Sequence, residues 1–536
     1  YQTDDQVTQA YNFRQQLDFS RNFGELHDLV AILGSETRHM KVESTGNNLY
    51  NYDPEMLSYT AVNGNALSSL STILGGNSWS NSNMTTRREL VNRFVSFYGN
   101  AGYTYDSRYN ATASLRWDRS NLWGTNSRYQ NKPLWSVGAG WNIFRESFFE
   151  VEQVNALKMR FSYGIGGNIA KDAAPYMTAR YSNNYNVGGL YGSVSTRPNP
   201  ELSWEKTTTT NIGIDFALFD NRLVGSIDYY NKYGEDLLAN TMGVPTEGFG
   251  YNTYKINNGE MRNRGLELSL SGDLIRTRDF NWNASLLAAR NKNEVTYVNV
   301  EAPVYILQLD YPEAYPIVGN PYNAIYAYQW AGLNGNGLPQ VKDAEGNATT
   351  ANPSTLDAID FAGSTVPSLS GSFGSILRYK QVELSFLLVY EYGHKRRNTF
   401  LPTLGSSWSG AVGSYITSLG GAVNKDIANR WREPGDEAHT DIPAVVFAES
   451  PNYLYDSGMI YSYADHNVLD MSNIRLSNLS LAYRLPNTLT RKLQLHGARL
   501  QFNVENAFTF AKSRDAKYLM GGYASPTFVG GLTLDF

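Results

Sequence analysis

The stretch that decides the fold is NPELSWEKTTTTNIGIDFALFDNRLVGSIDYYNK, residues 199–232. From Ile212 to Leu218 apolar side chains occupy every second position, and Gly, Asp and Ala lie between them. A short turn at residues 219–222 follows, and the alternation resumes over residues 223–230. A pattern of period two on both sides of a short turn predicts a long antiparallel hairpin with one apolar face.

Six more hairpins and a final strand repeat this pattern along the 536-residue chain. Their approximate ranges are 10–40, 90–103 with 109–118, 134–141 with 157–163, 264–271 with 282–289, 370–377 with 382–390, 474–485 with 499–510, and the strand 527–536. Together with the first hairpin they predict an all-β fold of about 15 antiparallel strands.

Composition indicates where such a sheet would reside. Hydrophobic residues make up 42% of the chain and the mean hydropathy is -0.41. No run of the sequence approaches the roughly 18 apolar residues that a spanning helix needs. A spanning strand needs only about 9–11 residues and exposes alternate ones to lipid, and the 38 Tyr suit its interfacial girdles. A net charge of -5 without a basic stripe argues against nucleic acid, and the absence of Cys excludes disulfides and Cys-ligated metals.

The connections between the strands are of two kinds. The turns within the hairpins are short, whereas the connections between hairpins are long and rich in Asn, Gly, Ser and Tyr. The long ones are residues 43–88, 164–199, 238–258, 291–367 and 393–472. This asymmetry is typical of outer-membrane barrels and predicts a transmembrane antiparallel β-barrel with short periplasmic turns and long extracellular loops. Such loops would form a surface that contacts a ligand or a partner.

Strand parity and the chain ends carry further expectations. A complete barrel has an even number of strands with both ends in the periplasm, so about 15 strands predict the C-terminal part of a longer protein. The first residues, YQTDDQVTQA, lack the charged and apolar regions of a signal peptide. The last strand resembles the endings that the insertion machinery of bacterial outer-membrane barrels reads, the alternative being an ordinary edge strand. The residues of this insertion signature are Phe528, Leu532, Leu534 and Phe536.

The opening stretch also resembles a known family. NPELSWEKTTTTNIGIDF and NRLVGSIDYYNKYGEDLL are similar to the SusC/RagA-like TonB-dependent transporters of the Bacteroidota outer membrane. Further segments resemble the same family in the same order: NNGEMRNRGLELSLSGDLI at residues 257–275, WAGLNGNGLPQVKDAEGN at 330–347, NRWREPGD at 429–436 and SNIRLSNLSLAYRLP at 472–486. The resemblance covers at least residues 197–536 and is weaker before them.

This resemblance implies a barrel of about 22 strands with a plugged lumen. Residues 1–536 would be its C-terminal portion, with the N-terminal plug and the first strands outside this chain. It implies import of large nutrients, with oligosaccharides or glycans favoured and oligopeptides next. A SusD-like lipoprotein would form the outer lid, TonB would supply energy through the N-terminal part, and two transporter–lipoprotein pairs could form a dimer. A passive porin or a barrel-based surface adhesin is the alternative, and an enzyme embedded in a barrel is a second one.

Two sets of residues are candidates for function within this fold. Tyrosines cluster in one long loop, where stacking on sugar rings or peptide side chains would suit an importer, although interface girdles and loop packing use Tyr equally well. The substrate candidates are Tyr305, Tyr311, Tyr315 and Tyr322, and Tyr326 and Tyr328 lie in the same span. Charged residues on the polar face of the strands should mostly pair with one another or with the plug. They are Asp215, Asp228, Glu267, Glu383, Arg484 and Glu505.

Three patterns were weighed for other chemistry. The six His never show the spacing of a zinc site. Residues 163–168, YGIGGN, resemble a phosphate-binding loop, but a turn at the barrel rim is the better interpretation because no helix follows. Residues 333–337, LNGNG, with Asp343 and Glu345 could hold Ca²⁺, but Asn-Gly pairs favour a hairpin turn. No catalytic residue, cofactor or metal ligand is therefore predicted.

Overall fold

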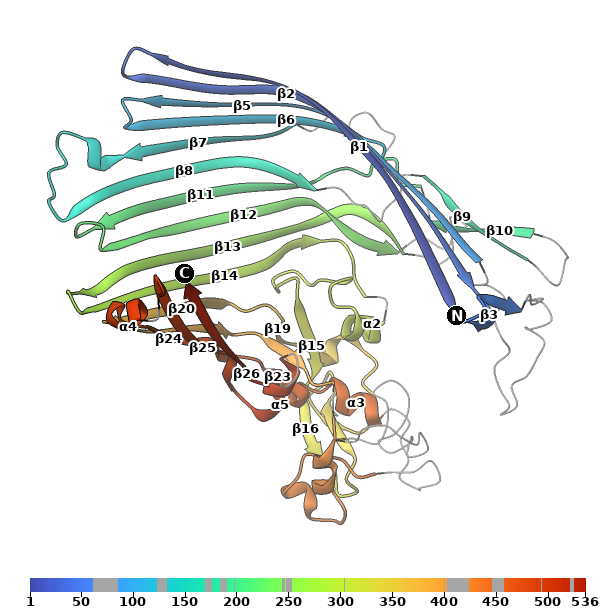
Figure 1. Ribbon diagram of the computed structural model, residues 1–536. Coiled ribbons are helices and arrows are strands. Elements are labelled where there is room, and N and C mark those ends of the chain that lie inside the picture. The colour runs from blue at the N-terminus through green and yellow to red at the C-terminus, as the bar shows by residue number, and fades with distance from the viewer. Residues whose placement is uncertain are drawn as a thin grey trace. The chain divides into compact units, whose positions relative to one another are not determined.

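The computed structural model describes residues 1–536 except 61–84, 123–132, 169–175, 184–189, 197, 243–245, 247–252, 303, 400, 403–423, 446–456, 493 and 521–524. Its main element is a 15-stranded sheet in the order β1-β2-β5-β6-β7-β8-β11-β12-β13-β14-β20-β21-β24-β25-β26 (Figure 1). Each strand therefore lies next to the main-sheet strand that follows it in sequence. The predicted all-β fold and its strand number are confirmed.

The long strands exceed their predicted lengths at most ends. They are β1 (Gln2–Phe23), β2 (His27–Asn48), β5 (Thr85–Tyr105), β6 (Tyr109–Ser120), β7 (Leu134–Asn142), β8 (Val154–Asn168), β11 (Glu205–Leu218), β12 (Leu223–Met242), β13 (Thr253–Arg276), β14 (Phe280–Val298), β20 (Leu369–Tyr379), β21 (Val382–Tyr392), β24 (Asn473–Arg484), β25 (Gly497–Ala511) and β26 (Thr527–Asp535). The sequence predicts a rim turn at the Gly-rich residues 163–168. They instead lie inside β8, because alternate glycines are compatible with an extended backbone.

The chain divides into two compact units. The first comprises Tyr1–Asp106, Ala111–Val137 and Gly167–Trp204, and contains β1, β2, β5 and most of β6. In it β1 and β2 pair antiparallel from Gln2↔Asn48 to Phe23↔His27. Two short hairpins complete this unit: β3 (Tyr50–Asp53) with β4 (Ser58–Thr60), and β9 (Thr178–Asn183) with β10 (Leu190–Thr196).

The second unit contains the hairpin of the opening stretch. β11 pairs with β12 from Lys206↔Glu235 to Leu218↔Leu223. Phe219, Asp220 and Asn221 connect them, and all three have positive φ, at 56°, 57° and 60°. Three consecutive left-handed residues reverse the chain tightly, and among residues other than Gly, Asp and Asn tolerate this conformation best. The predicted turn is confirmed at these positions.

One face of the sheet is apolar and exposed. In the second unit Ile214 lies opposite Ile227, which lies opposite Leu268 on β13, so a single register row is apolar across three strands. Ile214 is 41% exposed and Ile227 40% exposed. In the first unit Leu17 and Leu33 form a still more exposed apolar pair. Alternation with an exposed apolar face is the pattern of strands that contact lipid. Among the described residues, no helix has the length and apolarity to cross a membrane.

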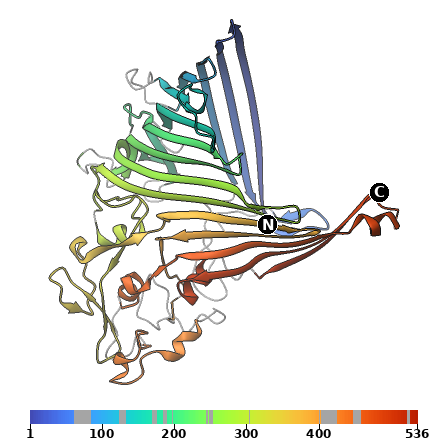
Figure 2. The same cartoon turned by 90° about the vertical axis from the view of Figure 1, so that its left-hand side faces the viewer.

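Two long connections in the second unit fold together into what we call the loop module, the described parts of residues 299–368 and 393–472. Figures 1 and 2 show it at the end of the strands opposite α4 (Asn487–Lys492). Its elements are α2 (Tyr305–Asp310), β15 (Ala324–Tyr328), β16 (Trp330–Leu333), β17 (Pro339–Lys342), β18 (Ala348–Thr349), η5 (Leu356–Ala358), β19 (Ile359–Ser364), β22 (Lys395–Arg397), η6 (Lys425–Asn429), η7 (Asp436–Ala438), α3 (Ser457–Tyr463), η8 (Asp465–Asn467) and β23 (Val468–Asp470). Outside it lie η3 (Ile143–Arg145) and α5 (Arg514–Leu519).

Candidate functional site

The loop module has a core of its own. All five residues of β15 are buried, because β19 pairs along its edge and α2 and α3 pack near it. Tyr328 is fully buried, and its hydroxyl donates to Asn352 Oδ1 at 3.1 Å. The same Asn352 donates from Nδ2 to the hydroxyl of Tyr305 at 2.7 Å. Buried Tyr hydroxyls need such partners, so part of the Tyr-rich segment serves packing.

A partly buried arginine ties four elements of this core together. Arg397 of β22 donates from Nη1 to Ser462 O at 3.1 Å and from Nη2 to Tyr326 O at 2.5 Å. Its guanidinium lies over the ring of Tyr463, 4.7 Å from the centroid. The hydroxyl of Tyr463 donates in turn to Asp310 Oδ1 at the end of α2. Burial lowers the pKa of Arg397 to about 10, so its guanidinium stays charged at neutral pH.

Two of the segments that resemble the transporter family contact each other in the module. Residues 334–337 form the turn between β16 and β17, where Gly337 N donates to Asn334 O at 2.9 Å, so the predicted hairpin turn is confirmed. Gly337 has a φ of +72°, and a Cβ there would lie 2.4 Å from the indole of Trp431 in the NRWREPGD segment. Trp431 donates from Nε1 to Glu437 Oε2 at 2.9 Å. The two segments therefore form one packed corner.

The four candidate tyrosines occupy different environments. Tyr315 is 7% exposed, and its carbonyl accepts a hydrogen bond from Gln308 Nε2 at 3.0 Å. Tyr305 packs against the module core. Tyr311 is 55% exposed and Tyr322 40% exposed, so their rings are the accessible ones. Burial, with the carboxylates of Glu313 and Glu205 nearby, raises the pKa of the Tyr322 hydroxyl, which therefore remains protonated at neutral pH.

The polar face of the sheet in the second unit is held by ion pairs. Arg160 of β8 donates from Nε to Asp215 Oδ2 at 2.7 Å and lies 3.0 Å from a carboxylate oxygen of Asp228. Glu383 lies 2.7 Å from Arg378 Nε and 3.3 Å from Arg499 Nη2. The predicted pairing is thus confirmed for Asp215, Asp228 and Glu383. For Glu267, Arg484 and Glu505 it stays a prediction.

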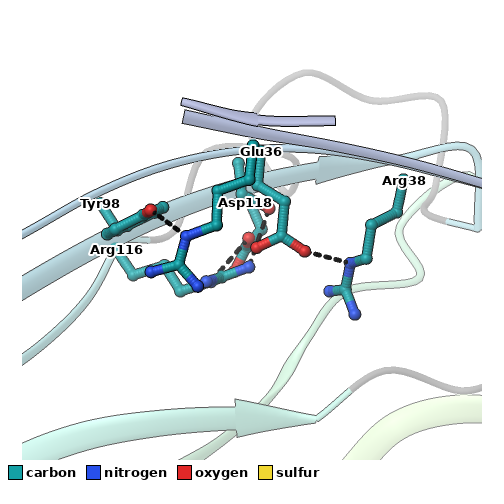
Figure 3. Close-up of polar contacts among 7 residues, drawn as sticks. Glu36, Arg38, Tyr98, Arg116 and Asp118 are labelled. Carbon is teal, nitrogen blue, oxygen red and sulfur yellow. Dashed lines mark hydrogen bonds and ion pairs between the residues drawn. The ribbon is translucent and has the colours of Figure 1, made fainter. Parts of the chain in front are cut away.

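A similar network crosses the polar face of the first unit (Figure 3). Arg14 of β1 donates from Nε to the Tyr98 hydroxyl at 2.6 Å, and Tyr98 is nearly buried because it lies over Gly34. Arg116 pairs with Asp118 at 2.9 Å on β6. Figure 3 also shows the pair Arg38–Glu36 on β2, at 3.0 Å. Sequence reasoning missed this set, although the charged residues occupy the positions that alternate with apolar ones on the same strands.

The C-terminal strand β26 carries the proposed insertion signature. Phe528 lies opposite Val504 and Leu532 opposite Leu500, and Phe528 stacks on Phe502 with centroids 6.1 Å apart. Phe528 is 66% exposed and Leu532 61% exposed. Leu534, opposite Ala498, and the terminal Phe536 are exposed as well. These residues extend the apolar face, and their reading by insertion machinery stays a prediction.

A large antiparallel sheet with one exposed apolar face and one charged face, carrying a folded loop module at one end, belongs to the class of membrane-spanning β-barrels. Comparison with known proteins makes this specific. Residues 1–507 match the family described as TonB dependent receptor-like, beta-barrel, and the chain belongs to this family of outer-membrane receptors. Its members are receptors and transporters, which confirms the prediction that the chain is not an enzyme.

Individual relatives agree with this assignment. The chain is 30% identical to TonB-dependent receptor SusC of Bacteroides thetaiotaomicron over 476 residues, 83% of this chain and 44% of that protein. It is 30% identical to TonB-dependent receptor P3 of Formosa agariphila over 450 residues, 78% of this chain and 41% of the relative. The RagAB peptide importer in its closed-closed state superposes with a TM-score of 0.77 at 25% identity, over 100% of this chain and 56% of that one. The SusC/RagA resemblance is confirmed, and the chain spans about half the length of the relatives it matches.

Proposed function

We propose that this chain is the C-terminal barrel portion of an outer-membrane transporter that imports large nutrients with energy from TonB. The observations that carry the proposal are the similarity of 83% of this chain to SusC and of the whole chain to the structure of the RagAB importer. The N-terminal plug, the first strands and the TonB-contacting segment would lie outside residues 1–536. In this arrangement the short turns and the C-terminus are periplasmic, and the loop module is extracellular.

The loop module would receive substrate and partner at the cell surface. Its own core supports this proposal, because a packed loop can present rigid contacts, whereas a plain connector would need no core. A SusD-like lipoprotein would close over it, and two such pairs could assemble as a dimer. Oligosaccharides are the favoured substrates and oligopeptides the next, with the exposed rings of Tyr311 and Tyr322 available for stacking.

The test is uptake by cells that carry the full-length protein. Labelled oligosaccharides and oligopeptides should enter only when both the transporter and TonB are present. Changing Tyr311 and Tyr322 together to Ala should reduce uptake about 30-fold, since each stacking ring contributes about 1 kcal/mol and each 1.4 kcal/mol is about a factor of ten. Tyr379→Ala is the matched control, because Tyr379 is 55% exposed at the turn end of β20. Uptake that persists in cells without TonB would favour a passive porin. If cells without the transporter lose surface attachment but take up the labelled oligomers as before, an adhesin would be favoured.

A further inference from the structure

A cationic cavity of about 730 Å³ lies in the second unit, where the ends of β21, β24 and β25 meet β22 and α5. Among the described residues, four cationic side chains and one carboxylate, that of Glu391, line it. The cations are Lys395, Arg396, Arg475 and Lys517. The volume is within the range of small-molecule sites. Neither the Tyr candidates nor the paired charges of the sheet described above belong to this cavity.

The Glu391 carboxylate is already engaged. Glu391 Oε2 accepts a hydrogen bond from Asn473 Nδ2 at 3.1 Å. Asp470, just outside the lining, lies 4.0 Å from Lys395 Nζ and equally far from Lys512 Nζ, so it is shared between two cations. These two carboxylates do not balance the positive charge around the cavity. An anion entering here would meet a net attractive field.

Two buried nitrogen atoms of the cavity lining have no hydrogen-bond partner within the described part of the chain. They are Nε of Arg475 and Nδ1 of His394. A buried guanidinium N–H without an acceptor is costly, and native structures usually satisfy it. Arg396, by contrast, donates from Nη1 to Leu519 O at 2.5 Å, which fixes α5 against β22. The lining is therefore held in place while it keeps donor capacity unused.

We infer that this cavity binds a carboxylate or sulfate group of an acidic oligomer that the transporter imports. An oxyanion would supply the acceptor that Arg475 Nε lacks, and His394 Nδ1 can donate to it in the tautomer that carries the proton there. A neutral oligomer could fill the space but would leave the charge uncompensated. The inference rests on the proposed function and deepens it, because it narrows the substrate to acidic oligomers. The acidic group can belong to a uronic-acid oligosaccharide or to an acidic peptide.

Binding to the purified full-length transporter tests the inference, with three probes of equal length: trigalacturonate, triglutamate and neutral maltotriose. At least one acidic probe should bind in preference to maltotriose, and more weakly as salt rises. Arg475→Gln and Lys517→Gln should each weaken that binding about tenfold or more, since a bond to a charged group is worth about 1.5–3 kcal/mol. Arg278→Gln, an exposed residue in the β13–β14 turn, should leave binding unchanged.

The outcomes distinguish an acidic glycan from an acidic peptide, and failure of the inference from failure of the proposed function. Preference for trigalacturonate identifies an acidic glycan, and preference for triglutamate an acidic peptide. The inference is overturned if neither acidic probe binds better than maltotriose, or if the Arg475 and Lys517 variants bind like Arg278→Gln. The proposed function fails by a different measurement, namely uptake that does not depend on TonB. Circular dichroism and heat-modifiable gel mobility show whether each variant is folded.

Discussion

Replacing the partly buried Arg397 by Met should loosen the loop module while the membrane sheet stays folded. Met reproduces the unbranched stem of the Arg side chain out to the position of Nε and lacks the charge and the hydrogen-bond donors of the guanidinium. Two backbone carbonyls, of Ser462 and Tyr326, would lose their donor, and the ring of Tyr463 would lose the cation above it. Because these contacts join β15, β22 and α3, the effect should concentrate in those elements.

The expected size follows from these contacts. Each hydrogen bond from a charged donor is worth about 1.5–3 kcal/mol, and a desolvated cation–π contact about 2 kcal/mol. Burying a guanidinium carries a desolvation penalty of several kcal/mol, which Met avoids. The net loss of local stability should therefore be about 2–4 kcal/mol. At about 1.4 kcal/mol per factor of ten, this corresponds to amide exchange about 30-fold to several-hundred-fold faster.

Hydrogen exchange of the full-length protein in lipid nanodiscs measures the local loss of stability directly. The exchange of peptides covering β15 and α3 is compared with that of peptides covering β11 and β12. The control is Arg432→Met, since Arg432 is exposed in the same module and its guanidinium donates from Nη2 to Ala428 O at 2.7 Å. It should change exchange by less than about threefold, as surface substitutions do. Equal exchange in the two variants, or faster exchange in β11 and β12 as well, would refute the reasoning.

Three further predictions use matched pairs or pH. Ile227→Arg should lower the free energy of unfolding in vesicles by about 2–4 kcal/mol, because Ile227 lies on the lipid face. Ser226→Arg, on the other face, should lower it by under about 1 kcal/mol. Urea unfolding measures both values, and equal losses would contradict the assignment of faces. Gly337→Ala should speed amide exchange in residues 334–338, because Gly337 has a left-handed φ and the added methyl would clash with the indole of Trp431. Gly335→Ala should leave the exchange unchanged, because open space surrounds that position. Hydrogen bonds from the backbone N–H groups of Arg432 and Glu433 lower the pKa of Asp436. The carboxylate therefore stabilises the loop fully above the unfolded pKa of about 4, and this stabilisation is lost as pH falls through the folded pKa. Proteolysis at residues 429–444 should therefore be faster for Asp436→Asn than for the native protein at pH 7, and the two rates should converge once the pH is below the folded pKa of Asp436.

The strands and their faces could be predicted because they depend on local information. A period of two survives in any register, so the apolar positions of β11 and β12 identify the exposed face before any partner is known. Turn chemistry is equally local, as the consecutive left-handed residues Phe219, Asp220 and Asn221 illustrate. Even the pairing of Asp215 followed from a general rule, that charges on a sheet face require partners, although the partner Arg160 lies 55 residues away in sequence.

The loop module could not be predicted, because its contacts are not local and its sequence has no period. Tyr463 and Asp310 are 153 residues apart, and the Tyr328 hydroxyl depends on an Asn in a different segment. The sequence places six tyrosines in one span, and four of them, Tyr305, Tyr311, Tyr315 and Tyr322, are its candidates for substrate contact. The fold divides them: Tyr326 and Tyr328 form the core, and Tyr311 and Tyr322 remain exposed.

The same argument explains why the cationic cavity escaped sequence reasoning. Lys395 and Arg396 follow β21, Arg475 begins β24 and Lys517 lies in α5, so no window of the sequence contains more than two of these charges. A count of charges gives a net value of -5, which points away from anionic ligands. Only the antiparallel order β21-β24-β25 brings these strand ends together, and it does so at the end of the sheet that carries the loop module. Because the electrostatic character of a site depends on local charge and not on the total, an acidic chain can present a cationic cavity to its substrate.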